Sequence, residues 1–270
     1  MGKYRNPFAN WQRTPEAHFR LYFFAAVSHL LQQLNLTFGS VEQAFEQYPF
    51  LKGYAQERDR YEPAGMDAGS ATVWWREILE DWEQNAICHL PLRALRDGFR
   101  VDQSAMTLLL GVGLIEEDAR FGLLFESMQG SPGQQRPTVN LLNAWWGGEG
   151  RNGEVRTSLR QLNELGLVQF LNTDAPRTAW TVEVPGVLWD ALRGEAHESI
   201  TTWAQYRPPE DLCSLDQLIV SPQLLEKLVA LPTLLAAGDS NCLIVRGPER
   251  NGRRTVLGFW RAAWAKGYWK

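Results

Sequence analysis

A stretch near the end of the sequence, GPERNGRRT at 247–255, has the residue types of a phosphate-binding loop. In the Walker A pattern a glycine, four residues, a second glycine and a lysine precede a serine or threonine. Here Arg253 stands at the lysine position and Arg254 at that of the Mg²⁺ ligand, so that Thr255 comes one residue late. Backbone N–H groups at the start of a helix favour anions whatever the side chains. We therefore expect phosphate binding; the alternative is a strand, turn and helix without a ligand.

The residues on either side of this loop indicate a strand before it and a helix after it. Residues 242–245 are a short apolar run typical of a buried strand, and 255–265 carry apolar residues at helical spacing. The glycine pair alone is weak evidence, because Gly148 and Gly153 repeat its spacing with no strand before them. The order of strand, loop and helix is what favours a phosphate-binding site.

The composition excludes several other kinds of site. Three cysteines, Cys88, Cys213 and Cys242, lie far apart, which indicates free thiols. The four histidines have no metal-ligand spacing, and there is no GxSxG nucleophile motif. A net charge of -4 gives no general attraction to nucleic acid or to anionic membranes. No apolar run reaches the roughly 18 residues of a membrane span, so we expect a cytoplasmic protein without a metal site or membrane contact.

Residues 1–118 are expected to form a helical region. Thr14 and Pro15 are typical of a helix start, and apolar residues follow them at steps of three and four. Asp102 is the predicted N-cap of a later helix. The stretch 53–70 has no apolar periodicity and ends in small residues, so we expect a long mobile loop there.

Residues 119–194 change from helical spacing to the alternation of strands. Gly166 follows the last helical segment, as is typical of a helix C-terminus. The expected order is a helix at 119–129, a helix at 136–146, a glycine-rich turn at 147–153, a third helix that carries Val155 to Leu165, and then a hairpin of strands at 167–171 and 179–184. Three helices followed by a two-stranded hairpin resemble a winged-helix domain.

Winged helices commonly place their third helix in the major groove of DNA, so DNA binding has to be weighed. Between residues 121 and 194, six arginines stand against seven acidic residues, whereas DNA-binding domains usually present a clearly basic surface. The candidates for DNA contact are Arg151, Arg156 and Arg160, of which the last two are one helical turn apart. We expect protein contacts here, and DNA binding is the alternative.

Three segments of the sequence, in order, resemble a known family. Over about 90–260, the chain is similar to the N-terminal part of certain bacterial AAA+ ATPases, which are frequently encoded beside phage-tail-like contractile injection systems. Those proteins have a helical N-terminal region, a winged-helix domain, and an ATPase domain whose P-loop often reads GRRT. Besides the GPERNGRRT stretch, the matching residues are Leu92, Leu95, Leu108, Leu109, Leu110, Asp118, Arg120, Gly122, Leu124, Gln129, Arg136, Pro137 and Thr138.

The resemblance implies that ATP and Mg²⁺ bind at the loop and that the ATPase assembles into rings that reshape or disassemble a protein complex. Only 15 residues follow Thr255, which leaves no room for a Walker B carboxylate or the remaining strands. We therefore expect no ATP hydrolysis by this chain alone, and an oligomer only with the full ATPase domain. The nucleotide-binding residues implied are Gly247, Pro248, Asn251, Gly252, Arg253, Arg254 and Thr255.

The expected fold is mainly α, with a winged-helix (α+β) domain and the first strand, P-loop and helix of an incomplete α/β AAA+ domain. The expected divisions are 1–118, helical; 119–194, winged helix; 195–240, a linker and a helix; and 241–270, the start of the ATPase domain. The predicted function is that of an adaptor or assembly region that makes protein–protein contacts. The alternatives are a winged-helix DNA-binding regulator and a scaffold subunit without a ligand.

Overall fold

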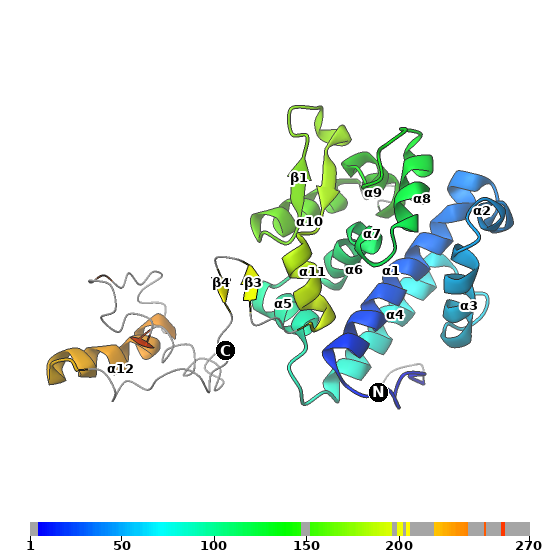
Figure 1. The fold of residues 1–270 in the computed structure, drawn as a ribbon. Helices are drawn as coiled ribbons and strands as arrows, with labels where there is room; N and C mark the ends of the chain where they lie inside the picture. Colours follow the sequence, from blue (N-terminus) through cyan, green and yellow to red (C-terminus); the bar gives the residue numbers. More distant parts are fainter. Residues whose placement is uncertain are drawn as a thin grey trace. The chain divides into compact units, whose positions relative to one another are not determined.

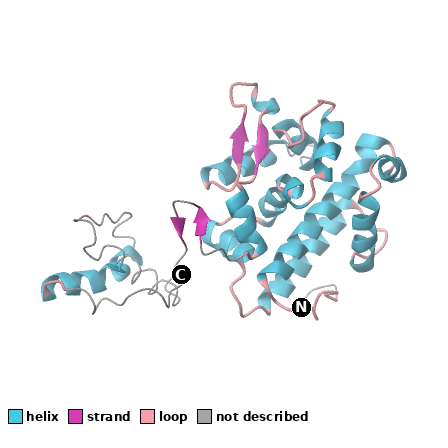
Figure 2. Cartoon of the chain, in the orientation of Figure 1, coloured by secondary structure: helices cyan, strands magenta, loops and turns pink. Residues whose placement is uncertain are grey.

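The computed structural model describes residues 5–146, 152–195, 199–201, 204–205, 219–236, 246 and 255–256. These residues are mainly helical: they form twelve α-helices and two small antiparallel sheets (Figures 1 and 2). The expectation of a mainly α chain is therefore confirmed. The chain divides into two compact units, Met1–Ala196 and His197–Lys270.

The described residues of the first unit form eleven α-helices, one short 3-10 helix and one hairpin. The hairpin consists of β1 (Gln169–Leu171) and β2 (Thr181–Glu183), with the 3-10 helix η1 (Arg177–Ala179) between them. The helices are α1 (Pro15–Phe38), α2 (Val41–Gln47), α3 (Leu51–Tyr61), α4 (Ala68–Gln84), α5 (Pro91–Phe99), α6 (Gln103–Val112), α7 (Leu114–Glu117), α8 (Arg120–Gln129), α9 (Val139–Trp146), α10 (Asn152–Glu164) and α11 (Gly186–Arg193).

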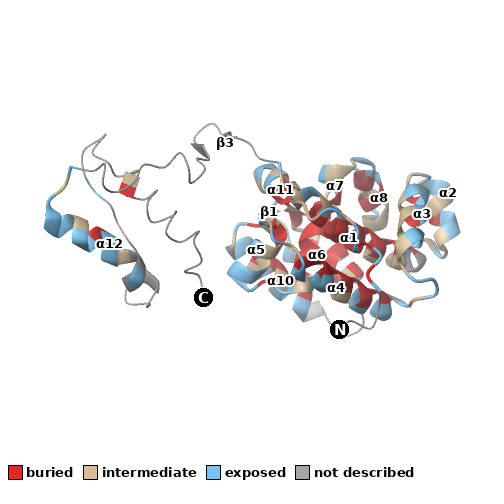
Figure 3. Ribbon diagram, turned by 90° about the horizontal axis from the view of Figure 1, so that it is seen from below, coloured by how far each residue is buried: buried red, intermediate tan, exposed pale blue. Residues whose placement is uncertain are grey.

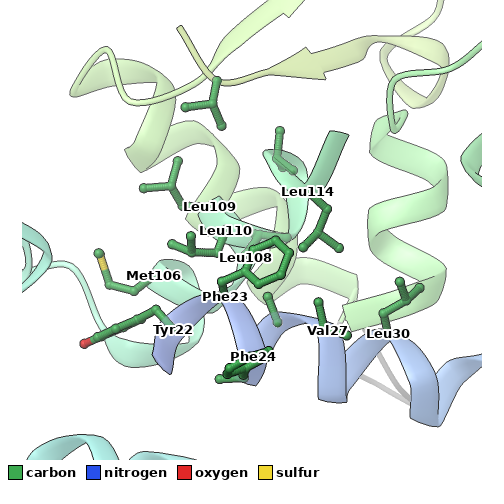
Figure 4. Packing of buried hydrophobic residues seen from close by; sticks show 14 of the residues in the cluster. Tyr22, Phe23, Phe24, Val27, Leu30, Met106, Leu108, Leu109, Leu110 and Leu114 are labelled. Atoms are coloured by element: carbon green, nitrogen blue, oxygen red, sulfur yellow. The ribbon is translucent and has the colours of Figure 1, made fainter. Parts of the chain in front are cut away.

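Helix α1 is the centre of the first unit. It begins as predicted, because Thr14 Oγ1 accepts a hydrogen bond from the Ala17 N–H at 3.2 Å and Pro15 stands in the first turn. α1 packs against α6, α4, α2, α3 and α11, and buried residues concentrate along α1 and α6 (Figure 3). Figure 4 shows side chains of both helices in one cluster, among them Val27 and Leu110. Each large apolar side chain buried in this way contributes about 1.5–3 kcal/mol.

The expected long loop at 53–70 is wrong. Helix α3 occupies most of this stretch, and α4 begins directly after Asp67, whose Oδ1 accepts a hydrogen bond from the Ser70 N–H at 2.7 Å. Leu51 and Ala55 are buried one turn apart and hold α3 against the core. Two buried positions are too few to produce a visible apolar period, and for that reason the sequence pattern did not reveal this helix.

Helices α8, α9 and α10 and the β1–β2 hairpin follow one another in the predicted order. After α10 the chain turns at Gly166, whose φ of +71° is a conformation that favours glycine. The two strands are antiparallel, with Phe170 opposite Val182. An isolated antiparallel bridge joins Thr138, just before α9, to Thr181 in β2. The hairpin is therefore attached to the connection between α8 and α9.

Helix α11 follows the hairpin and was not predicted from the sequence. Its Trp189 ring lies so close to Gly113 that a Cβ on this glycine would stand 2.1 Å from Cζ3 of the ring. Trp189 Nε1 also donates a hydrogen bond to Glu117 Oε1 at 2.7 Å. These contacts join α11 to the α6–α7 segment, and the hydrophobic core runs continuously from α1 to α11. The predicted division at residue 118 lies inside this unit.

The described part of the second unit is small. It contains a hairpin and one helix, namely β3 (Ser199–Thr201), β4 (Ala204–Gln205) and α12 (Pro222–Ala236). Ser221 caps α12, because its Oγ accepts a hydrogen bond from the Leu224 N–H at 3.3 Å. The expected strand at 242–245 lies outside the described residues. None of the helices in the described ranges is long and apolar enough to cross a membrane.

Candidate functional site

The predicted nucleotide loop lies almost entirely outside the described residues. Thr255 is described and stands half-buried in a helical turn with Val256, whereas 247–254 are not described. The helical turn agrees with a helix beginning after the loop. Binding of ATP and Mg²⁺ at this loop stays a prediction.

Two of the three arginines considered for DNA contact are described, and both are exposed on α10. Arg156 and Arg160 lie one turn apart, and neither has an ion pair with any described residue. Glu164 follows one turn later on the same face, and Glu154 is exposed at the beginning of the helix. Arg151 lies outside the described residues. Within its described residues, the exposed surface of α10 therefore carries two basic and two acidic side chains and forms no extended basic stripe.

An open groove of about 530 Å³ lies along α1 in the first unit. We call it the aromatic groove, because its floor consists of Phe19, Phe23 and Phe24 from α1 and of Phe50 and Tyr54 at the start of α3. Helices α3 and α11 pack on opposite sides of α1 (Figure 1). Residues of both helices line the groove. Aromatic side chains in an open hollow are typical of protein contact surfaces.

Two arginines cover the α3 side of the aromatic groove, and carboxylates hold both of them. Arg20 Nη2 lies 2.8 Å from Glu57 Oε1, and Arg120 Nη2 lies 2.6 Å from Asp118 Oδ2. Both guanidinium groups also stand over aromatic rings of the groove, at 5.3 and 4.8 Å from the ring centroids. Such a cation–π contact contributes about 0.5–1 kcal/mol at an exposed site. This side of the groove is therefore polar at its edge and neutral in charge.

The ion pair of Arg120 and Asp118 extends to the floor of the groove through Tyr54. The Tyr54 hydroxyl donates a hydrogen bond to Asp118 Oδ2 at 3.1 Å. Hydrogen bonds from Arg120 hold the pKa of Asp118 below its ordinary value. Burial, together with the negative charge of Asp118, raises the pKa of Tyr54 to about 12, so the phenol stays protonated at neutral pH. These contacts hold the floor and the edge of the groove in one arrangement.

The α11 side of the aromatic groove is acidic. Glu16, Glu117 and Glu195 line it with a single arginine, Arg193. Arg193 Nη1 lies 3.3 Å from Glu117 Oε1, and its Nε lies 3.2 Å from Glu195 Oε1. Glu16 is exposed and has no ion pair with any described residue. A Cβ placed on Gly194 would stand 3.2 Å from Glu16 Oε1. Because Gly194 directly follows Arg193 in the chain, the Glu16 carboxylate lies next to the backbone at Arg193.

A separate cluster of polar side chains, the Glu83 cluster, joins α1, α4 and α5. Glu83 Oε1 accepts hydrogen bonds from His18 Nε2 at 2.8 Å and the Tyr22 hydroxyl at 3.0 Å, and Glu83 Oε2 lies 2.8 Å from Arg96 Nη1. The side chains of His18 and Glu83 are 0% and 4% exposed. A substrate from solution cannot reach them, so we assign this cluster the role of holding the three helices together.

Burial decides the charge states in the Glu83 cluster. Burial lowers the pKa of His18, which is therefore neutral at pH 7 and donates from Nε2 to the carboxylate. Burial also acts against the Glu83 carboxylate, but hydrogen bonds from His18 and Tyr22 and the charge of Arg96 keep the pKa of Glu83 below its ordinary value. Glu83 is consequently ionised at neutral pH.

A smaller cavity of about 160 Å³ lies between α1, α4 and α6. His29 lines it, with its ring stacked on Trp146 at 4.4 Å and its Nε2 3.2 Å from the Trp145 carbonyl oxygen. Burial lowers the pKa of His29 to about 4, so this side chain is also neutral at pH 7. The chain continues past Trp146 outside the described residues.

Sequence reasoning missed the aromatic groove. The apolar steps of three and four residues on α1 include Phe19 and Phe23, but they do not include Phe24 or the exposed Arg20. The available signal was a run of aromatic residues, interrupted by Arg20, that covers more than one face of the helix. The groove itself also needs Glu117 and residues of α3, α8 and α11, which are far away in the sequence.

A comparison with known proteins finds no matching family model, no matching curated protein and no matching solved structure. The site therefore rests on its own geometry. Among the residues that the structure describes, no group of histidine, cysteine, aspartate or glutamate side chains could hold a metal ion. The aromatic groove, which is open, aromatic and charged at its edges, is the candidate functional site.

Proposed function

We propose that the first unit is a protein-binding adaptor and that the aromatic groove is its contact site. The observation that carries the proposal is the aromatic floor, which five rings from α1 and α3 form in a hollow open to solvent. Protein interfaces are enriched in aromatic side chains and arginine, and their hot spots lie in such hollows with a polar rim. The edge of this groove has that composition, with arginines held by carboxylates on both sides.

The adaptor would belong to an AAA+ ATPase, as the resemblance of the sequence implies. The order of α8, α9, α10 and the hairpin supports a winged-helix segment, and the bridge between Thr138 and Thr181 adds a short third strand segment to the sheet. ATP and Mg²⁺ would bind at 247–255 and would supply the energy for remodelling the bound protein. The partner would then be a component of the complex that the ATPase assembles or takes apart.

A matched pair of glycine substitutions tests the groove. Gly53 lines the aromatic groove in α3, and a Cβ placed on it meets no atom within 4 Å. Gly98 is a helical and exposed glycine of α5 with the same open space, and it does not line the groove. Gly53→Gln puts a polar side chain over the aromatic floor without changing the charge, and Gly98→Gln is the control. Both changes favour the helix, by up to about 1 kcal/mol, so neither should unfold the protein.

The assay is selection of a displayed library of random 16-residue peptides on the full chain. We expect peptides that are enriched on the wild type and on Gly98→Gln but not on Gly53→Gln. Equal enrichment on all three proteins would place the contact elsewhere, and no enrichment on the wild type would contradict the proposal of a peptide-binding groove. Circular dichroism of the variants checks that the fold is unchanged.

A second candidate function is DNA binding through α10. The observation that favours it is the exposure of Arg156 and Arg160, which have no ion pair with any described residue. The acidic residues on the same helix argue against DNA binding, because they repel the phosphates of DNA. The test is a titration of duplex DNA at several salt concentrations. Specific binding at physiological salt that is lost on Arg156→Ala and Arg160→Ala would replace the adaptor proposal; we expect no specific binding.

A further inference from the structure

We propose that the partner segment in the aromatic groove is an amphipathic helix with a lysine or arginine one or two turns from its apolar anchors. This inference rests on the proposed function and adds the chemistry of the partner. Two features of the groove carry it: the helical spacing of its aromatic floor, and the unequal charge of its two sides.

The spacing of the floor matches one face of a helix. Phe19 and Phe23 are one turn apart on α1, and their ring centroids are 6.3 Å from each other. Apolar side chains at positions i and i+4 of a partner helix are separated by about 6 Å along its axis. An amphipathic helix in a groove is one of the common modes of peptide recognition, and it uses anchors at this spacing. A volume of about 530 Å³ holds a few such side chains.

The charges of the groove favour a cationic partner. Within the described residues, each of the three arginines that line it is already paired with a carboxylate, as described above for Arg20, Arg120 and Arg193. An acidic partner gains an arginine only by displacing one of these carboxylates. A basic partner meets Glu16 directly, because this exposed carboxylate has no ion pair with any described residue.

The charges around Glu16 strengthen the preference of the groove for a cationic partner. On the α11 side, the Arg193 guanidinium pairs with Glu117 and Glu195 and not with Glu16, so a second cation beside Glu16 adds attraction without breaking either of these pairs. The site is exposed, and its contribution therefore decreases as salt rises. The basic residue adds specificity and a faster association rather than most of the affinity, which comes from the aromatic floor.

The position of Glu16 also sets the spacing in the partner. Glu16 precedes Phe19 by three residues and Phe23 by seven, which correspond to about 4.5 and 10.5 Å along α1. A partner helix that lies along α1 places its basic residue at a similar distance from its anchors. In the partner helix, the basic residue is therefore one or two helical turns from the apolar anchors.

The peptides that the display selection enriches test this inference. Peptides that lose their enrichment on Gly53→Gln depend on the groove, and the most enriched of them is resynthesised with a fluorescent label. A second labelled peptide, its acidic twin, has the same sequence with the basic residues changed to glutamate. Fluorescence anisotropy on the full chain compares the wild type with Glu16→Lys. The control is Glu42→Lys, because Glu42 is also an exposed acid in the first turn of a helix, at a site that does not line the groove.

We expect enriched peptides to carry lysine or arginine at the stated spacing. Glu16→Lys should weaken the basic peptide about tenfold and strengthen its acidic twin, whereas Glu42→Lys should change neither more than twofold. Glu16→Gln, which adds no charge, should give an intermediate loss. Groove-dependent peptides without an excess of basic residues, or equal binding to Glu16→Lys, would overturn this inference and leave the adaptor proposal standing. No groove-dependent peptide at all would overturn both.

Discussion

The carboxylate of Glu83 offers the sharpest test of how the first unit is held together. Glu83→Gln keeps the shape of the side chain and removes its charge. The amide oxygen can replace Oε1 and accept from His18 and Tyr22, but the amide N–H₂ group then takes the place of Oε2 and faces the guanidinium of Arg96. Two donors then face each other in the interior, and Arg96 loses its buried partner.

The expected loss in the free energy of unfolding follows from the burial of the Glu83–Arg96 ion pair. Removing one partner of a buried ion pair costs about 3–5 kcal/mol. The Arg96 side chain is 20% exposed and keeps a second carboxylate, Asp97, at 3.0 Å, so we place the loss at the lower limit, about 3 kcal/mol. For a chain of this size that loss lowers the melting temperature by about 6–12 °C. The control is Glu80→Gln, an exposed position of the same helix, which should change stability by less than about 0.5 kcal/mol.

The measurement is urea unfolding at pH 7, followed by tryptophan fluorescence. Trp82 reports on the cluster directly, because its ring is stacked on His18 at 5.6 Å. The pKa of Glu83 is lowered in the folded state, so its contribution is present above about pH 4.5 and is lost as the pH falls through the folded value. The stability difference between wild type and Glu83→Gln should therefore shrink in acid. A loss at pH 7 equal to that of Glu80→Gln would refute the assigned role of Glu83.

Three further predictions concern single positions in the first unit. Gly113→Ala should lower the free energy of unfolding by about 1–3 kcal/mol in urea melts, because its Cβ would stand 2.1 Å from the Trp189 ring. Gly98→Ala should raise that free energy by about 0.5–1 kcal/mol, since a Cβ there meets open space in an exposed helix; a loss would contradict this. The pKa of His29, lowered to about 4 by burial, should appear as an NMR titration midpoint near 4, and a midpoint near 6.5 would exclude the buried ring. Its contribution to stability is then present above pH 6.5 and is lost as the pH falls toward 4.

Much of the helical architecture could be predicted from local sequence signals. Thr14, Asp102 and Ser221 each accept the backbone hydrogen bond expected of an N-cap. The hairpin and the turn at Gly166 could be predicted as well, because strand alternation and a glycine after a helix are local patterns. These features depend on residues a few positions apart, and the sequence displays them directly.

The features that the sequence did not reveal depend on contacts between distant residues. Trp189 holds helix α11 against Gly113, which lies between α6 and α7 and is 76 residues earlier in the sequence. The aromatic groove likewise combines Phe19 with Tyr54, Glu117 and residues of α11, and no local period connects these positions. A local sequence motif therefore indicates a site at the phosphate loop, whereas no local motif indicates the groove along α1.

The central claim is that the aromatic groove binds a protein segment. Its most direct test is the dissociation constant of the best enriched peptide for the wild type, Gly53→Gln and Gly98→Gln, measured by fluorescence anisotropy. We predict a dissociation constant at least tenfold higher for Gly53→Gln, which corresponds to about 1.4 kcal/mol, and a value within twofold of the wild type for Gly98→Gln. Equal dissociation constants for all three proteins would contradict the claim.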